Sequence, residues 1–545
     1  MDYPLPETQH ALQLVGPREA VLNTSKSVHR PGPHQIVCRV EAAGLCFSDL
    51  KLMNQFAHHP RKSAIISGIE PAVLSEIPSY VPGELPTVPG HETVVRVCAV
   101  GEEVRLYQPG ERYLVETDYR WLRTEGSNGS FGYNFEGALQ QYVLMDERVI
   151  TSPDGESMLV PVSDHLSASA VALVEPWACV EDAYAEKQRL TRKTDGRTLV
   201  VVDDPRGMPA LARILRQHGV ESAAAFEAPG LPEGVFDDIF YPGASAETVE
   251  ALFPALAPRG LLNLVLCGRR FDRKVVCPVG RVHYGGIRIV GTPDSNPSIS
   301  MKSIPASAEL RERARVHIVG AGGPMGMMHV IRALCSGIAG ISVVGSDTDD
   351  ARLEALTRIA RPLAEATGVP FRVCNPTRES LENAFDYVVL MAPVPALVAQ
   401  AVERAAPHAI INIFAGIPAD VTAEIDLNAY VGKQLYFIGT SGSVLEDIKA
   451  VLAKVEDGRL DTNLSVAAIS GLDGAADGIR AIENRTVAGK VIVYPWCHGL
   501  GLTQLEELGE RLPSVAAALD DGRWTQAAET KLAEAFGYHT VGAIR

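Results

Sequence analysis

The sequence predicts an α/β protein in which a β-rich front part precedes two modules of alternating strands and helices. Residues 1 to about 160 contain short apolar runs, such as QIVCRVEAAG and ETVVRVCAVG, that are separated by Pro and Gly. After TRKTDGR the chain alternates between strand and helix patterns, which is typical of a parallel sheet covered by helices. This alternation occurs twice, and 545 residues are too many for one ordinary domain.

The two α/β modules resemble each other closely enough to predict an internal duplication. Three pairs of residues correspond at a constant spacing of 149 positions: Phe236 with Phe385, Pro258 with Pro407, and Asn263 with Asn412. Further on, RIVGT ending at Thr292 corresponds to YFIGT ending at Thr440. A spacing that holds over so long a stretch favours duplication over the general likeness of doubly wound units.

These patterns divide the chain into five expected parts. They are a β-rich domain over residues 1–193 that is completed by residues 460–500, a first α/β module over 194–300, a linker over 301–312, a second module over 313–459, and a helical tail over 501–545.

The composition is that of a globular enzyme. With 46% hydrophobic and 21% charged residues the chain can build large cores, and a formal charge of −16 argues against nucleic acid or an anionic membrane as a partner. The N-terminus shows no secretory signal, and nine scattered cysteines without a CxxC pair are typical of reduced thiols. We therefore expect a cytoplasmic protein with a small-molecule substrate.

The second module carries a glycine-rich turn between a strand and a helix, in RVHIVGAGGPMGMMHVIRAL. Such a turn places a pyrophosphate at the helix N-terminus, and Asp347 at the end of the next strand can bind the ribose hydroxyls and repel a 2′-phosphate. The turn is one residue longer than the plain GxGxxG pattern, yet its context predicts a Rossmann-type NAD site. The expected cofactor-binding residues are Gly320, Gly322, Gly323, Pro324, Met325, Gly326, Asp347 and Arg352.

The corresponding turn of the first module, VVVDDPRGM, carries Asp203 and Asp204 instead of glycines. Negative charge there would repel a pyrophosphate, by roughly 4 kcal/mol for like charges about 4 Å apart at an effective dielectric constant near 20. We therefore predict that the first module binds no cofactor and is kept for architecture.

Three stretches of the front part carry side chains that suit a metal ion: AAGLCFSDLK, VPGHETVV and LVEPWACVEDA. Cys46 offers a thiolate, His91 an imidazole, and Glu92 or Glu175 a carboxylate, which together suit a catalytic zinc site. Each residue alone has a structural interpretation, since Cys46 could be a small buried apolar residue and Glu175 could begin a helix. Their combination with a nucleotide module favours the metal site.

These residues carry a family resemblance. The sequence contains G-x-C-x-S-D around Cys46, P-G-H-E ending at Glu92, E-P-x-A-C-V from Glu175, the later G-x-G turn and a closing VAGKVIVYP. In these motifs it resembles the medium-chain, zinc-dependent dehydrogenases of the polyol and threonine dehydrogenase branch. The GAGGPMG turn and the long gap between Cys46 and His91 are also similar to sorbose-1-phosphate reductases. The resemblance implies a GroES-like catalytic domain completed by the closing segment and a Rossmann-type nucleotide domain.

The resemblance also implies roles for the site residues. Cys46, His91 and Glu175 would bind one zinc ion, with Glu92 as an alternate ligand or a neighbour of the ligands. Asp49 would orient His91, and Ser48 would take the proton of the substrate hydroxyl while hydride passes to the nicotinamide.

The sequence departs from the family pattern in three places. Lys51 stands where many relatives have a relay histidine, and the stretch from Glu116 to Glu136 has no cysteine, so a second, structural zinc is not expected. Between Cys46 and His91 lie 44 residues, longer than usual for the family. Four basic residues there could receive a substrate phosphate or acid, or could belong to a solvated loop: His58, His59, Arg61 and Lys62.

Subunits of this family commonly join the edges of their nucleotide-binding sheets. We therefore expect the strand at 287–291 to pair with the strand at 435–439 inside this chain and to close an edge that otherwise needs a second subunit. A homo-oligomer remains compatible with the sequence.

The expected function is hydride transfer between NAD and a secondary alcohol of a polyol, sugar or sugar phosphate, with one catalytic Zn²⁺. One alternative is an epimerase or lyase that retains its NAD, and another is a non-enzymatic scaffold or sensor. The set of Cys46, Ser48, His91 and Glu175 argues against a scaffold, which needs none of them.

Overall fold

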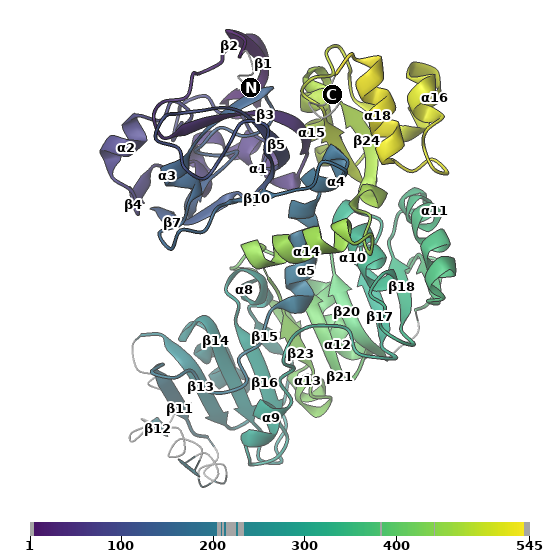
Figure 1. Cartoon of the computed structure of the whole chain (residues 1–545). Helices are drawn as coiled ribbons and strands as arrows, with labels where there is room; N and C mark the ends of the chain where they lie inside the picture. The colour runs from purple at the N-terminus through teal and green to yellow at the C-terminus, as the bar shows by residue number, and fades with distance from the viewer. Residues whose placement is uncertain are drawn as a thin grey trace. The chain divides into compact units, whose positions relative to one another are not determined.

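The computed structural model describes residues 5–203, 206, 209, 212–213, 225–226, 234–381, 384–440 and 442–538. The chain forms two compact units (Figure 1). Unit 1 consists of Met1–Ala178 and Val444–Arg545, and unit 2 of Cys179–Ser443. Within the described ranges, every helix is too short or too polar to cross a lipid bilayer.

Unit 1 is built on an eight-stranded sheet in which segments from both ends of the chain meet. The central strand β3 (Gln35–Gly44) is buried along almost its whole length and pairs with β5 (Glu92–Val100) and β9 (Tyr142–Asp146). β25 (Lys490–Val493) also pairs with the end of β3, antiparallel, so residues near 490 lie beside the front part of the chain. The other strands of this sheet are β6 (Arg112–Val115), β10 (Leu159–Pro161), β24 (Val466–Ser470) and β26 (Thr503–Gln504).

Two smaller sheets and several helices complete unit 1. The smaller sheets contain β1 (Thr8–Gly16) with β2 (Glu19–Ser27), and β4 (Ile65–Ser67) with β7 (Asp118–Thr124) and β8 (Asn128–Ser130). The α-helices are α1 (Phe47–Gln55), α2 (Pro71–Ser75), α3 (Glu147–Ile150), α4 (Ala168–Ala172), α14 (Leu445–Glu456), α15 (Ala475–Asn484), α16 (Leu508–Arg511), α17 (Pro513–Ala516) and α18 (Gln526–Ala535).

The C-terminal tail packs on its own unit. Glu529 on α18 accepts hydrogen bonds from the backbone N–H groups of Ala168 and Ser169, at 2.5 and 2.8 Å, and so binds the amide-rich start of α4. Trp524, just before α18, is 1% exposed and donates to the Ser169 hydroxyl. The tail is therefore part of the unit 1 core.

Unit 2 contains the Rossmann-type sheet that the glycine-rich turn predicts. Six parallel strands lie in the order β19-β18-β17-β20-β21-β23, so the sheet extends in opposite directions from β17 (Arg315–Val319). The other strands are β18 (Ser342–Ser346), β19 (Phe371–Cys374), β20 (Phe385–Leu390), β21 (Ala405–Ile413) and β23 (Tyr436–Ile438). The helices are α10 (Pro324–Leu334), α11 (Asp350–Thr367), α12 (Pro395–Arg404) and α13 (Leu427–Gly432).

The first α/β module forms a second parallel sheet of five strands in the corresponding order, β12-β11-β13-β14-β16. The strands are β11 (Thr198–Val201), β12 (Ala225–Phe226), β13 (Phe236–Pro242), β14 (Leu256–Val265) and β16 (Arg288–Thr292). The described helices near this sheet are α7 (Ala246–Leu252), α8 (Val279–Tyr284) and α9 (Ser298–Lys302).

The two sheets share local irregularities as well as strand order. The ladder of β13 with β14 shifts its register after Phe236, and the ladder of β20 with β21 shifts after the corresponding Phe385. Arg259 and His408, again 149 positions apart, both have positive φ, at 58° and 62°. These shared details favour the duplication, which itself stays a prediction.

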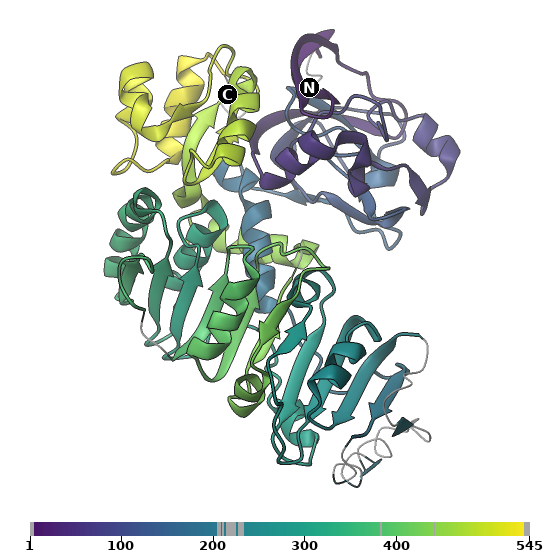
Figure 2. The ribbon, with the colours of Figure 1, turned by 180° about the vertical axis from the view of Figure 1, so that it is seen from behind.

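The two modules lie beside each other within unit 2 (Figures 1 and 2). β15 (Val275–Cys277) pairs antiparallel with β22 (Ala423–Ile425), and the central pair is Val276 with Glu424. β16 and β23 lie beside each other, and Arg288 donates to the Gly439 carbonyl at 3.4 Å, but no backbone ladder joins these strands. The expected edges therefore meet through side chains and the β15–β22 pair, not as one continuous sheet.

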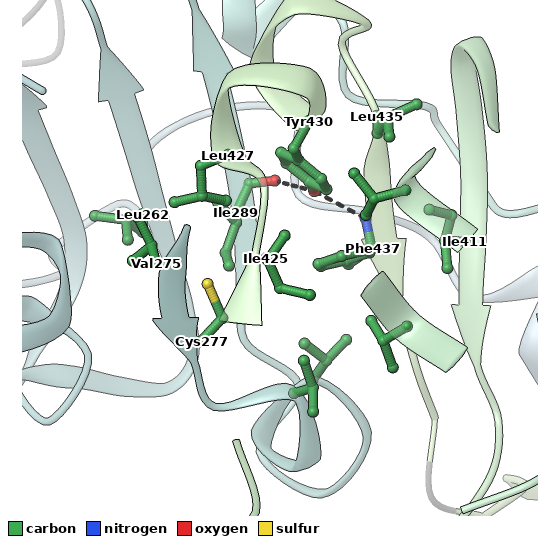
Figure 3. Packing of buried hydrophobic residues seen from close by; sticks show 14 of the residues in the cluster. Leu262, Val275, Cys277, Ile289, Ile411, Ile425, Leu427, Tyr430, Leu435 and Phe437 are labelled. Carbon is green, nitrogen blue, oxygen red and sulfur yellow. Dashed lines mark hydrogen bonds between the residues drawn. The ribbon is translucent and has the colours of Figure 1, made fainter. Parts of the chain in front are cut away.

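One hydrophobic core runs through both modules. Its central polar contact is Tyr430, which donates to the carbonyl of Ile289 at 2.8 Å and accepts from the N–H of Phe437 at 3.0 Å (Figure 3). Tyr430 thus joins a strand of the first sheet to a strand of the second. Because this buried core covers the edge at β23, we predict that the edge needs no second subunit.

We expect Tyr430→Phe to lower the free energy of unfolding by about 1–3 kcal/mol, because the substitution leaves a buried carbonyl and a buried N–H without their partner. Urea unfolding followed by circular dichroism measures the change. Tyr284→Phe is the matched control, since Tyr284 is 45% exposed. Equal stability of both variants would show that this contact does not hold the modules together.

Candidate active site

The candidate site begins where β3 ends and α1 starts. Cys46 precedes the first helical residue, and Asp49 in the first turn accepts a hydrogen bond from the Cys46 N–H at 2.9 Å. The other oxygen of Asp49 accepts from the N–H of Gly90 at 3.1 Å. Asp49 is 1% exposed, so one buried carboxylate fixes the backbone on both sides of the site.

His91 lies next to this carboxylate. Its Nδ1 atom is 3.3 Å from Asp49 Oδ1, and the residue is 5% exposed. A carboxylate at one ring nitrogen orients a histidine so that its other nitrogen is available to a ligand. The structure thus places Asp49 where it can orient His91, the role that the resemblance implies.

Three potential metal ligands converge at this point. The donor atoms of Cys46, His91 and Glu92 all lie within 4.8 Å of one another. The carboxylate of Glu92 is fully buried, and its Oε2 atom has no hydrogen-bond partner. A thiol, an imidazole and an unpaired buried carboxylate oxygen form a donor set that fits Zn²⁺. In the described part of the chain this is the one group of three or more such side chains.

Glu175, the third ligand that the resemblance implies, is outside that group. It lies in the first turn of α5 (Val174–Ala185), within electrostatic range of His91, Glu92 and Lys490. Burial raises the pKa of Glu175 to about 7, and the Glu92 carboxylate acts in the same direction while His91 opposes it. Glu92 therefore belongs to the converging set, and the assignment of Glu175 as a ligand stays a prediction.

Lys490 is a site residue that sequence reasoning missed. Its ammonium group donates to Glu92 Oε1 at 2.6 Å and to the carbonyl of Leu45 at 2.7 Å, and the side chains of Lys490 and Glu92 are 5% and 0% exposed. Glu92 thus uses one oxygen for Lys490 and leaves the other free. The available signal was a lysine in the apolar closing strand KVIV, where a charged side chain requires a buried partner.

Ser48 and Lys51 lie on α1 beside the converging residues. Ser48 is half-buried in the first turn. Lys51 is exposed, and its ammonium group lies 5.5 Å from the ring centroid of Phe47, which is itself 57% exposed. The structure therefore gives Lys51 an aromatic neighbour at the surface.

The basic residues between Cys46 and His91 separate into different environments. Lys62 is completely buried and donates to the carbonyls of Val81 and Leu85. It therefore joins two parts of the segment between Cys46 and His91. Burial lowers the pKa of Lys62 to about 8. His58 is exposed, while His59 and Arg61 are partly buried. The four residues therefore do not act as one basic cluster.

The glycine-rich turn in unit 2 has the geometry that its sequence predicts. Gly320 has a φ of 82°, and a Cβ atom at Gly326 would lie 2.3 Å from the Gly320 carbonyl, so helix α10 can approach the turn only without a side chain there. Gly323 precedes the helix and Pro324 is its first residue. Met325 follows in the first turn of α10.

Asp347 and Arg352 both lie against this turn. The Oδ2 atom of Asp347 accepts from the N–H of Gly322 at 3.0 Å. A Cβ atom at Gly322 would come within 2.6 Å of the Cβ of Arg352. Asp347 therefore lies beside the turn, where an acidic side chain can bind the ribose of a dinucleotide.

The corresponding turn of the first module differs. Asp203 accepts hydrogen bonds from the hydroxyls of Tyr241 and Thr248, so its carboxylate is occupied within the module. Asp204 lies outside the described residues, as does most of the helical stretch after it.

A β-rich domain with this group of side chains, next in the chain to a Rossmann-type sheet, is the architecture of medium-chain dehydrogenases. Residues 32–154 match the family of alcohol dehydrogenase GroES-like domains. Over this segment the chain matches that domain family, and its overall fold is similar to that of medium-chain dehydrogenases.

Individual relatives are more distant. The chain is 27% identical over 243 residues to an uncharacterized protein, YggP, of Escherichia coli K12, and 26% identical over 253 residues to L-sorbose 1-phosphate reductase of Klebsiella pneumoniae. These matches cover 41% and 45% of this chain and 56% and 60% of the relatives, so the chain spans a little over half the length of these relatives. The solved structure of 2R,3R-butanediol dehydrogenase from Bacillus subtilis shares the fold with a TM-score of 0.52 and 16% identity, covering 90% of this chain and 100% of that one.

We expect Lys490→Met to lower the free energy of unfolding by about 3 kcal/mol or more, because the substitution leaves the buried Glu92 carboxylate without its counter-charge. Thermal and urea unfolding measure this change. The control is Lys449→Met, which breaks the exposed ion pair with Glu156 and is expected to cost less than about 1 kcal/mol. A similar small effect of both variants would contradict the role of Lys490.

Proposed function

We propose that the chain is a zinc-dependent oxidoreductase that transfers hydride between NAD(H) and a secondary alcohol or ketone of a polyol, sugar or sugar phosphate. The observation that carries the proposal is the convergence of Cys46, His91 and Glu92 with one unpaired, buried carboxylate oxygen. The match to the alcohol dehydrogenase GroES-like domain and the similarity to a sorbose-phosphate reductase support the reaction class.

In this proposal each residue has a defined task. A bound zinc ion would supply Lewis acidity to the substrate oxygen. Asp49 orients His91, and Lys490 holds one oxygen of the Glu92 carboxylate through an ion pair. On oxidation, the Ser48 hydroxyl would accept the proton of the substrate hydroxyl and pass its own proton on towards solvent, and a bound NAD would supply the acceptor for the hydride of the carbinol carbon.

The test is NADH formation at 340 nm with a panel of polyols, sugar alcohols and their phosphates. We expect activity that is lost on dialysis against a chelator and restored by Zn²⁺, with about one zinc per chain by metal analysis. Cys46→Ser should lower both zinc content and kcat/KM at least 100-fold, while Cys179→Ser should keep both, because Cys179 is not among the converging ligands. Activity that survives the loss of Cys46 and of metal would contradict the proposal.

We further propose that NAD is preferred over NADP. The Asp347 carboxylate lies at the glycine-rich turn and receives the N–H groups of Gly322 and Asp349, at 3.0 and 3.2 Å. These hydrogen bonds hold the Asp347 carboxylate at the place where the 2′-phosphate of NADP is expected to lie, so the two anionic groups would repel each other.

Asp347→Ser should therefore lower kcat/KM for NAD about 10-fold and reduce the preference for NAD over NADP by a larger factor. Steady-state kinetics with both cofactors measure the two ratios. The control is Asp349→Asn, which can keep the hydrogen bond to the N–H of Arg352 at the start of α11. A wild-type protein that prefers NADP would overturn this assignment.

A further inference from the structure

The ring of Tyr133 connects the candidate metal site to the long segment between Cys46 and His91. The centroid of Tyr133 lies 5.6 Å from that of His91 and 5.1 Å from that of His59. The guanidinium carbon of Arg61 lies 5.5 Å from the same centroid. Two basic residues of that segment are thus one aromatic ring away from a predicted metal ligand.

The Arg61 guanidinium has N–H groups that are available to another acceptor. Among the described residues, its recorded charge partner is Asp118, at 3.6 Å, a loose ion pair. Asp118 is shared, because Asn128 donates to it at 3.0 Å and Arg120 at 3.4 Å. A guanidinium has five N–H groups, so one long contact to a shared carboxylate leaves most of them for another acceptor.

The electrostatic surroundings of Arg61 link it to the candidate site. Although burial opposes its charge, Asp118, Tyr133, Glu175 and Glu116 raise the pKa of Arg61, which places the guanidinium in the field of the predicted ligand Glu175. The side chain is 29% exposed, so a substrate group can reach it.

His59 is held as a neutral donor. Its Nδ1 atom accepts the N–H of Arg61 at 3.2 Å, so a proton on the neutral ring resides on Nε2. Burial, and then the charges of Arg61, Lys51 and His91, lower the pKa of His59 to about 4. At neutral pH His59 therefore offers an N–H group beside Arg61 and does not carry protons.

Glu116 is a buried carboxyl group near Asp118 in the sequence and in the structure. The residue is 5% exposed, its Oε1 atom accepts the N–H of Asp118 at 3.0 Å, and its buried Oε2 atom has no hydrogen-bond partner. Burial raises the pKa of Glu116 to about 7, with Glu175 and Asp118 acting in the same direction.

We propose that Arg61, together with the Nε2–H group of His59, binds an anionic group of the substrate, so that the preferred substrates are polyols or sugars that carry a phosphate or a carboxylate. This proposal rests on the proposed function, since it assigns the substrate class of the same site. Arg61 suits this task because its planar fork can make two parallel hydrogen bonds to either anion.

The test compares the same polyol with and without the anionic group in the zinc- and NAD-loaded protein. The probes are sorbitol, sorbitol 6-phosphate and the sugar acid gluconate, and the readout is kcat/KM at 340 nm. We expect wild type to favour one of the two anionic substrates over sorbitol. Arg61→Gln should lower kcat/KM for that substrate about 10–100-fold, mainly through KM, and change that for sorbitol less than about threefold. Preference for phosphate or for carboxylate identifies which anion the site takes.

Two further variants separate recognition from folding. Arg61→Lys keeps the charge and loses the fork, so an intermediate loss is expected. Arg120→Gln removes a neighbouring, more exposed contact to Asp118 and should leave the preference unchanged. Thermal midpoints and zinc content should match wild type for all three variants.

The outcomes distinguish this proposal from the proposed function. The same anionic probes are also added without NAD, and the thermal shift is measured in wild type and in Arg61→Gln. If no substrate is oxidised but anionic probes stabilise wild type and not Arg61→Gln, the reaction is wrong and the anion site stands. Turnover without preference for an anion, or a preference that survives Arg61→Gln, overturns the role of Arg61.

Discussion

The candidate site depends on the different surroundings of the two oxygens of the Glu92 carboxylate. One oxygen accepts the Lys490 ammonium group, and the other is buried without a hydrogen bond. Two buried groups of opposite charge stabilise each other only when both are present, which makes residues nearly 400 positions apart interdependent. The closing strand is therefore a part of the site itself and not only of the sheet that carries it. The pairing of β25 with β3 is what brings Lys490 to this point.

In unit 2, the two α/β modules depend on each other because they cover each other's edge strands. Each sheet is open, with β16 at one edge of the first and β23 at one edge of the second, and an exposed edge is prone to association. Here the two edges cover each other through side chains around the β15–β22 pair. Gly291 and Gly439 occupy corresponding positions, and a Cβ atom at either would collide with Val431 or His283 of the other module. Such reciprocal contacts are the pattern of an isologous interface, here within a single chain.

Some of this could be predicted from the sequence and some could not. The order of the nucleotide-binding sheet follows from a glycine-rich turn and alternating patterns, because these are local signals. The convergence of Cys46 with His91 follows from the residue types in their two motifs, although the gap between the motifs is unusually long. The sequence does not predict which glutamate joins them, because Glu92 on β5 and Glu175 on α5 are positioned by the packing of these elements. Lys62 illustrates the same limit, because its basic neighbours suggested a charged surface while its side chain is fully buried.

Two of the three departures from the family pattern form one structure. The long segment after Cys46 supplies β4, and the stretch that lacks the expected cysteines supplies β7 and β8, which form one three-stranded sheet. Their loops are also joined, since Thr124 donates to the Pro60 carbonyl and Asn134 to that of Ser63. These hydrogen bonds join the segment after Cys46 to the cysteine-free stretch. The same sheet carries Asp118, and the ring of Tyr133 lies between His91 and Arg61, so the proposed anion site is built from the two segments that depart from the family pattern.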